Sequence, residues 1–148
     1  MKARGWHVQM YTNLAVISAI KDAVLASPVP VVFDHFGGAQ AALGLEQPGF
    51  SDLLQLVKSG KAYVKISGAY RASQKAPDYV DAAPLARALI AANPERILWG
   101  TDWPHPNSAP TASSRVVSFW MSCPRARVKM LFHTPPGRGG VSRSSCKF

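Results

Sequence analysis

The chain has 148 residues, 47% of them apolar, which is enough for one domain with a sizeable core. Residues 1–106 carry ten Lys and Arg against eight Asp and Glu, whereas 107–148 carry seven basic residues and no acidic one. A nearly neutral body with a basic C-terminal end disfavours a specific nucleic-acid-binding domain. The two cysteines lack CxxC spacing, and no apolar run is long enough to span a membrane or to form a signal peptide. We therefore expect a cytoplasmic protein with no membrane partner.

The first third of the chain alternates strand and helix patterns. A short β-prone run begins near residue 7, and Asn13 is placed to cap a helix over 14–27. The "VVF" run at 31–33 then predicts a strand that is buried on both faces. It is followed by Asp34, His35, Phe36 and two glycines, Gly37 and Gly38.

The same alternation continues through the next two units. The segment "FSDLLQLVKSG" at 50–60 predicts a helix with Ser51 as its cap, and "AYVKISG" at 62–68 predicts a strand. Another helix begins near Pro84, a favourable first-turn position. "RILWG" at 96–100 predicts the last strand.

Strands that begin near residues 7, 31, 62 and 96, with helices between them, predict a parallel α/β sheet with right-handed crossovers. Periodicity alone leaves open whether the sheet is doubly wound or part of a (β/α)₈ barrel. No GxGxxG follows the first strand, which disfavours dinucleotide binding. We expect this domain to occupy 1–106, with an irregular, basic Ser- and Pro-rich tail over 107–148.

Polar side chains follow every predicted strand, where parallel α/β folds gather their functional groups. They include Tyr11, His35, Arg71 and Asp102. Each also has a structural interpretation: a packing tyrosine, a loop histidine, a solvated arginine and a turn-capping aspartate. The functional interpretation makes Asp102 a general base or metal ligand, His35 an electrophile or metal ligand, and Arg71 a grip on a substrate carboxylate.

The segments "GWHVQMY", "VVFDHFGG", "YVKISGAYR" and "ILWGTDWPHP" resemble, in order and spacing, the later strands of the TIM-barrel amidohydrolase superfamily. They are most similar to the amidohydrolase 2 branch, which includes the 2-pyrone-4,6-dicarboxylate lactonases. The resemblance covers about residues 4–106. It implies a partial (β/α)₈ TIM barrel with parallel strands and about half of the barrel present.

The resemblance implies a hydrolase that opens a lactone or similar cyclic ester of an anionic substrate. Asp102 matches the family's catalytic carboxylate, and His35 matches a histidine that polarises the carbonyl or binds metal. Arg71 and Tyr11 match positions that contact substrate carboxylates. The resemblance implies either a divalent metal such as zinc, held by His35 and Asp102, or no cofactor, as in the pyrone lactonases.

The family opens with a His-x-His pair, which this sequence lacks. We therefore expect a truncated form with little activity alone. The alternative is a non-catalytic partial barrel that self-associates through open sheet edges or pairs with a partner chain.

Overall fold

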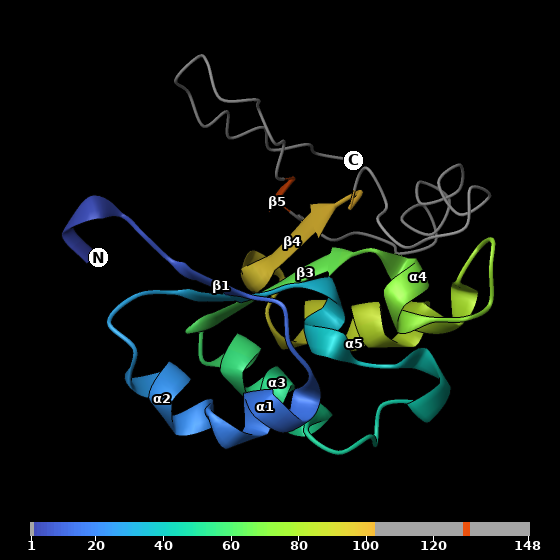
Figure 1. The fold of residues 1–148 in the computed structure, drawn as a ribbon, viewed down its shortest axis with the longest axis horizontal. Coiled ribbons are helices and arrows are strands. Elements are labelled where there is room, and N and C mark those ends of the chain that lie inside the picture. The colour runs from blue at the N-terminus through green and yellow to red at the C-terminus, as the bar shows by residue number, and fades with distance from the viewer. Residues whose placement is uncertain (1, 103–128, 131–148) are drawn as a thin grey trace, which may run out of the picture.

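The computed structural model describes residues 2–102 and 129–130. Within them the strands form one parallel sheet in the order β1-β2-β3-β4-β5 (Figure 1). These strands are β1 (Val8–Met10), β2 (Val31–Phe33), β3 (Ala62–Ser67), β4 (Ile97–Gly100) and β5 (Lys129–Met130). The expected parallel α/β architecture is confirmed, and β1 to β4 begin within one residue of their predicted positions.

The α-helices connect the strands and cover one face of the sheet. They are α1 (Leu14–Ala19), α2 (Lys21–Ala26), α3 (Phe50–Lys58), α4 (Ala69–Ala72) and α5 (Ala83–Ala92). In Figure 1, α1, α2, α3 and α5 all lie below the sheet, whereas α4 lies at the carboxyl end of β3. The remaining turns are 3₁₀ helices: η1 (Lys2–Arg4), η2 (His35–Gly38), η3 (Ala41–Leu43), η4 (Val80–Ala82) and η5 (Pro94–Arg96).

The core lies between the sheet and the helices. Strand register places Phe33, Val64 and Ile97 side by side, and all three are fully buried. Helix α3 packs its apolar face, including Leu53 and Leu56, into the same cluster. Burying each of these side chains stabilises the fold by about 1.5–3 kcal/mol. The strand ends that carry the polar residues are therefore held in place by this packed core.

The opposite face of the sheet carries polar side chains. Asp34, just after β2, accepts two hydrogen bonds from Gln9 Nε2 at 2.9 and 3.2 Å. Its Oδ1 also lies 2.9 Å from Lys65 Nζ on β3. An ionised carboxylate that is 9% exposed needs such partners, because burying it unpaired would be costly. The three residues thus form a polar link across β1, β2 and β3.

Two helix boundaries differ from the sequence prediction. The helix expected over 14–27 is divided at Ile20, which ends α1 and begins α2 with φ −100° and ψ 7°. Ser51 is not the cap of α3. The helix begins at Phe50, and its N-cap is Gly49, which has φ 85°. A Cβ on Gly49 would lie 2.8 Å from Leu14 O, so close packing against α1 determines this start.

Other local predictions are confirmed. Asn13 caps α1, with Oδ1 accepting a hydrogen bond of 3.1 Å from Val16 N. Helix α5 begins with Pro84 in its first turn. Both features are set by neighbouring residues alone, which is why the sequence pattern was sufficient to place them.

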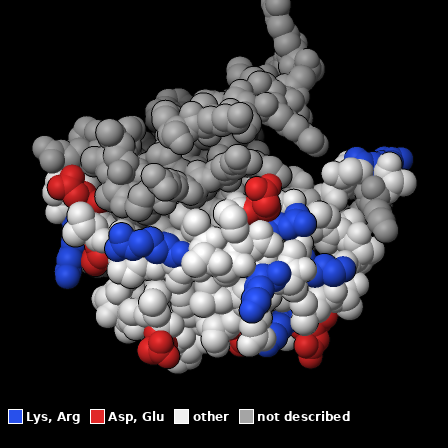
Figure 2. All heavy atoms as spheres, turned by 180° about the vertical axis from the view of Figure 1, so that it is seen from behind, with Lys and Arg blue, Asp and Glu red and all other residues white. Residues whose placement is uncertain are grey.

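Part of the expected irregular tail forms a strand. Lys129–Met130 pairs with β4 as β5, which the sequence analysis did not anticipate. The other residues of 103–148 lie outside the described part of the chain. Figure 2 shows basic and acidic side chains side by side over the described surface seen from behind. No helix among the described residues is long and apolar enough to cross a membrane.

Candidate active site

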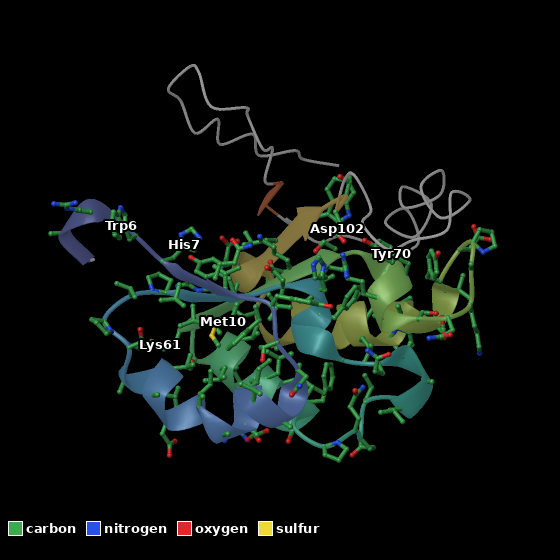
Figure 3. The ribbon with its side chains drawn as sticks, in the orientation of Figure 1. Trp6, His7, Met10, Lys61, Tyr70 and Asp102 are labelled. Carbon is green, nitrogen blue, oxygen red and sulfur yellow. The ribbon has the colours of Figure 1, made fainter. Side chains whose placement is uncertain are left out.

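Three adjacent strands deliver the candidate side chains to one end of the sheet. His35 follows β2, Tyr70 and Arg71 lie on α4 directly after β3, and Asp102 follows β4. Figure 3 shows Tyr70 and Asp102 beside each other at this end, with His7 and Trp6 toward the other. Because all three strands are parallel and in register, side chains far apart in the sequence meet here.

Asp102 is the centre of this cluster. Its Oδ2 accepts hydrogen bonds from Tyr70 Oη at 2.5 Å and from Arg71 Nε at 2.9 Å. Its Oδ1 lies 3.7 Å from His35 Nε2. The Asp102 side chain is 18% exposed, so it is largely shielded yet reachable from solvent. The two carboxylate oxygens therefore have different surroundings.

His35 is oriented by Ser67 at the end of β3. Its Nδ1 lies 3.0 Å from Ser67 Oγ and 3.3 Å from Ser67 O. When the hydroxyl donates to Nδ1, the ring proton sits on Nε2 and faces Asp102. When the ring is doubly protonated, Nδ1–H donates to the carbonyl instead. A neutral ring with its proton on Nδ1 would donate to Ser67 and leave Nε2 unprotonated, so Nε2 presents a proton to the site only in the two states just described.

Tyr11 borders the cluster from the end of β1. Its ring meets the His35 ring edge to face, with centroids 5.4 Å apart and planes at 82°. The Arg71 guanidinium carbon lies 5.6 Å from the Tyr11 ring and 5.1 Å from the Tyr70 ring. Tyr11 itself is 70% exposed. The structure thus brings together all four residues singled out in the sequence: Tyr11, His35, Arg71 and Asp102.

These contacts set the charge states of Asp102, Tyr70 and Arg71 at neutral pH. Burial opposes ionisation of Asp102, but hydrogen bonds from Tyr70 and Arg71 hold the pKa of its carboxyl below the ordinary value. Burial and the bond to Asp102 raise the pKa of Tyr70 to about 12. Burial opposes the charge on Arg71, yet Asp102 keeps the pKa of its guanidinium raised. Asp102 is therefore ionised and Tyr70 is protonated.

The backbone around the site is in conformations that side chains rarely adopt. His35, Phe36 and Asp102 have φ of 50°, 58° and 62°. Each such residue costs roughly 1–2 kcal/mol and persists only where surrounding contacts impose it. Gly68, with φ 58°, fits between the two candidate catalytic groups. A Cβ there would lie 2.9 Å from Asp102 Oδ2 and 3.0 Å from His35 Nδ1.

The donor set decides whether a metal fits. Among the described residues, no group of three or more His, Cys, Asp or Glu side chains gathers in one place. His35 and Asp102 provide two donors, whereas a catalytic zinc site uses three protein ligands. Asp102 Oδ2 is already engaged by Tyr70 and Arg71. The described residues do not make a complete metal site, and the chemistry below uses none.

Two contributors were not recognised from the sequence. From the sequence, Tyr70 beside Arg71 is most simply a packing residue, and nothing singles out Ser67. Their position next to Arg71 and Gly68 in "SGAYR" was the available signal, because the residue after a buried parallel strand faces the functional edge. That signal does not identify the hydrogen-bond partner of Tyr70, because Asp102 lies more than thirty residues away in the sequence.

The fold and the site define a parallel α/β protein with polar side chains at the carboxyl ends of its strands. The chain belongs to the amidohydrolase family, whose model matches residues 1–136. It is 37% identical over 100 residues to the 4-sulfomuconolactone hydrolase of Hydrogenophaga intermedia, covering 68% of this chain and 33% of that protein. It is 34% identical over 112 residues to the 2-pyrone-4,6-dicarboxylate hydrolase of Comamonas testosteroni, covering 70% and 37%.

A solved structure shares the fold. A Pseudomonas putida protein described as a 2-pyrone-4,6-dicarboxylic acid hydrolase superposes with a TM-score of 0.62 at 41% identity. The match covers 70% of this chain and 39% of that one. The sheet and helices described above are therefore part of a TIM-barrel hydrolase fold. The chain spans about a third of the length of the curated relatives it matches.

Proposed function

We propose that this chain carries the general base and the oxyanion-binding group of a lactonase, which opens a cyclic ester bearing negative charge. The observation that carries the proposal is the convergence of His35 and Asp102, from the ends of β2 and β4, to 3.7 Å. A carboxylate that stays ionised beside an imidazole N–H can remove a proton from water while the imidazole binds the developing oxyanion.

In the proposed reaction, Asp102 Oδ1 accepts a proton from a water molecule as the water oxygen attacks the lactone carbonyl. The carbonyl electron pair moves to its oxygen, which accepts a hydrogen bond from His35 Nε2–H. When that pair returns, the ring C–O bond breaks. The proton on Asp102 passes to the departing oxygen, giving a hydroxy acid and restoring the carboxylate.

Arg71 and Tyr11 are proposed to hold the anionic group of the substrate. The Arg71 guanidinium uses Nε for Asp102, and its planar fork extends between the rings of Tyr11 and Tyr70. Guanidinium binds carboxylate with two parallel hydrogen bonds, which fixes orientation as well as charge. The relatives named above, a sulfomuconolactone hydrolase and a pyrone dicarboxylate hydrolase, support an anionic cyclic ester as the substrate class.

We further propose that the 148-residue chain is slow on its own. It spans about a third of its relatives and holds no His-x-His pair. Asp102 would then supply the base, His35 the oxyanion-binding group and Arg71 the anion-binding group. The substrate would lack the contacts that the other strands and loops of a full barrel provide. A positioned base alone is worth about 10²–10⁴-fold, so a residual rate should be measurable at high protein concentration.

The test is hydrolysis of 2-pyrone-4,6-dicarboxylate and neutral lactones by the full chain and by Asp102→Asn. This variant keeps the side-chain shape but removes the base, so the rate above background should fall by about 10²–10⁴-fold. Asp22→Asn, an exposed carboxylate on α2, is the matched control and should leave the rate unchanged. Dicarboxylate binding, followed through the His35 ring NMR signals, gives a second readout.

Two results would contradict the proposal. One is a rate that Asp102→Asn and Asp22→Asn leave equally intact. The other is a chain that neither accelerates any lactone nor shows His35 shifts with millimolar dicarboxylate. If such a chain also eluted as an oligomer, the alternative of a self-associating, non-catalytic partial barrel would be favoured.

A further inference from the structure

We propose that Tyr70 is a positioning residue that anchors Oδ2 of Asp102 and thereby makes Oδ1 the oxygen that accepts the proton from water. The inference deepens the proposed function and rests on the role of Asp102 as base. It assigns a role to a side chain that packing arguments alone would leave structural.

The geometry separates the two oxygens of one carboxylate. Both donors from α4, Tyr70 Oη and Arg71 Nε, reach Oδ2, at 2.5 and 2.9 Å. Oδ1 receives neither of them and faces His35 Nε2 at 3.7 Å. A carboxylate oxygen that already accepts two hydrogen bonds is a weaker proton acceptor than its neighbour. The proton from water is therefore directed to the oxygen beside the oxyanion-binding imidazole.

The anchor also opposes rotation of the carboxylate. Asp102 has φ 62°, a backbone conformation that an aspartate keeps only where surrounding contacts impose it. Tyr70 and Arg71 are consecutive on α4, and Gly68 before them leaves the space into which the carboxylate fits. Arg71 is also proposed to bind substrate, so Tyr70 is the donor whose bond to Oδ2 persists whether or not substrate competes for the guanidinium.

The experiment removes one hydroxyl group. Tyr70→Phe keeps the ring beside Arg71 and deletes the bond to Oδ2. Titration of the Asp102 side-chain carbon by ¹³C NMR should show its midpoint rising by roughly one pH unit. The kcat of the full chain should fall about tenfold, with KM for the dicarboxylate within twofold and the acid limb of the rate profile shifted upward. If Tyr70 had a purely structural role, Tyr70→Phe would lower the melting temperature but leave both the Asp102 titration midpoint and the acid limb of the rate profile unchanged.

Tyr63→Phe is the matched control. Tyr63 also lies under an arginine, with the Arg96 guanidinium carbon 4.7 Å from its ring, and its hydroxyl accepts a hydrogen bond from Arg96. It stands on β3 toward the opposite end of the sheet, so its loss should leave the Asp102 midpoint in place. A Tyr70→Phe midpoint and kcat equal to the parent values would overturn the inference, even with Asp102→Asn inactive. Full activity in Asp102→Asn would instead refute the proposed function.

Discussion

Two carboxylates in this molecule bind the same kinds of partner and yet are suited to different tasks. Asp52 on α3 accepts a hydrogen bond from Ser18 at 2.7 Å and lies 2.7 Å from Lys21 Nζ, each on a different oxygen. Asp102 also binds one hydroxyl and one cation, but both contact Oδ2. The first arrangement uses both oxygens to join helices. The second leaves one oxygen for chemistry.

The backbone under the two residues differs in the same sense. Asp52 lies in the first turn of α3, where a carboxylate is favoured by the helix dipole. Asp102 has φ 62° and follows the end of β4. A residue held in a strained conformation beside a shielded partner is typical of functional sites, whereas a residue in regular helix is typical of surface stabilisation. The difference lies in the backbone and the partner geometry, since both side chains are aspartates.

The largest effect should come from Gly68→Ala, which places a methyl group in the space that the Asp102 carboxylate occupies. The new Cβ would be under 3.0 Å from Asp102 Oδ2 and adopt φ 58°. Positive φ and crowding together should lower the free energy of unfolding by about 2–4 kcal/mol and remove measurable lactonase activity. Urea denaturation and the lactone assay measure both.

Gly60→Ala separates strain from crowding. Gly60 has φ 78°, but the three atoms nearest to a Cβ there belong to the Arg96 side chain, at 3.5–3.8 Å. It should be destabilised by the strain alone and keep its residual activity. Equal losses of activity in the two variants would show that the space left by Gly68 is unimportant to the site.

An intermediate effect is expected from Arg71→Lys. Lysine keeps the charge but loses both the Nε–H that bonds Asp102 and the planar fork, so KM for the dicarboxylate should rise about tenfold with a smaller change in kcat. Lys21→Arg beside Asp52 is the equivalent exchange at the other carboxylate and should leave both constants unchanged. Steady-state kinetics on the two variants decides the point, and an unaltered KM in Arg71→Lys would remove this residue from substrate binding.

The smallest effect is the dependence of stability on pH. The pKa of both Asp102 and Asp52 lies below the ordinary value of 3.8, for Asp52 because of its bonds to Lys21 and Ser18. A lowered pKa in the folded state means that each contribution is complete above pH 3.8 and is lost as the pH falls through the folded-state value. The unfolding free energy of the parent should therefore approach that of Asp102→Asn below pH 4.

The comparison with Asp52→Asn sharpens this measurement. Asp52 is solvent-accessible, so salt screens its bonds and the difference from the parent should be small at every pH. Denaturant titrations at pH 7, 4 and 2.5 give both curves. A gap between parent and Asp102→Asn that widens as the pH falls would contradict the assigned direction.

Local patterns in the sequence predicted most of the scaffold. The strand starts, the Asn13 cap and the Pro84 helix start depend on neighbouring residues, and these were confirmed. The cap at Ser51 failed because contact between Gly49 and α1 set the start of α3, which no local pattern contains. The helix break at Ile20, where φ is −100° and ψ is 7°, was also not anticipated.

The candidate site was predictable in its members and not in its connections. His35, Arg71 and Asp102 follow buried strands, so their edge of the sheet could be deduced. Which oxygen of Asp102 meets Tyr70, and which nitrogen of His35 meets Ser67, depends on strand register and on backbone angles that residue types alone do not specify.

The polar link between Gln9, Asp34 and Lys65 has a consequence for folding. Side chains on a strand alternate between its faces, so a slip of one residue in β3 would turn Lys65 toward the helices and expose Val64 or Ile66. Asp34 would then be left without its ammonium partner. A shifted sheet with an isolated buried charge would be costly, so the link favours the observed pairing of the first three strands over a shifted one.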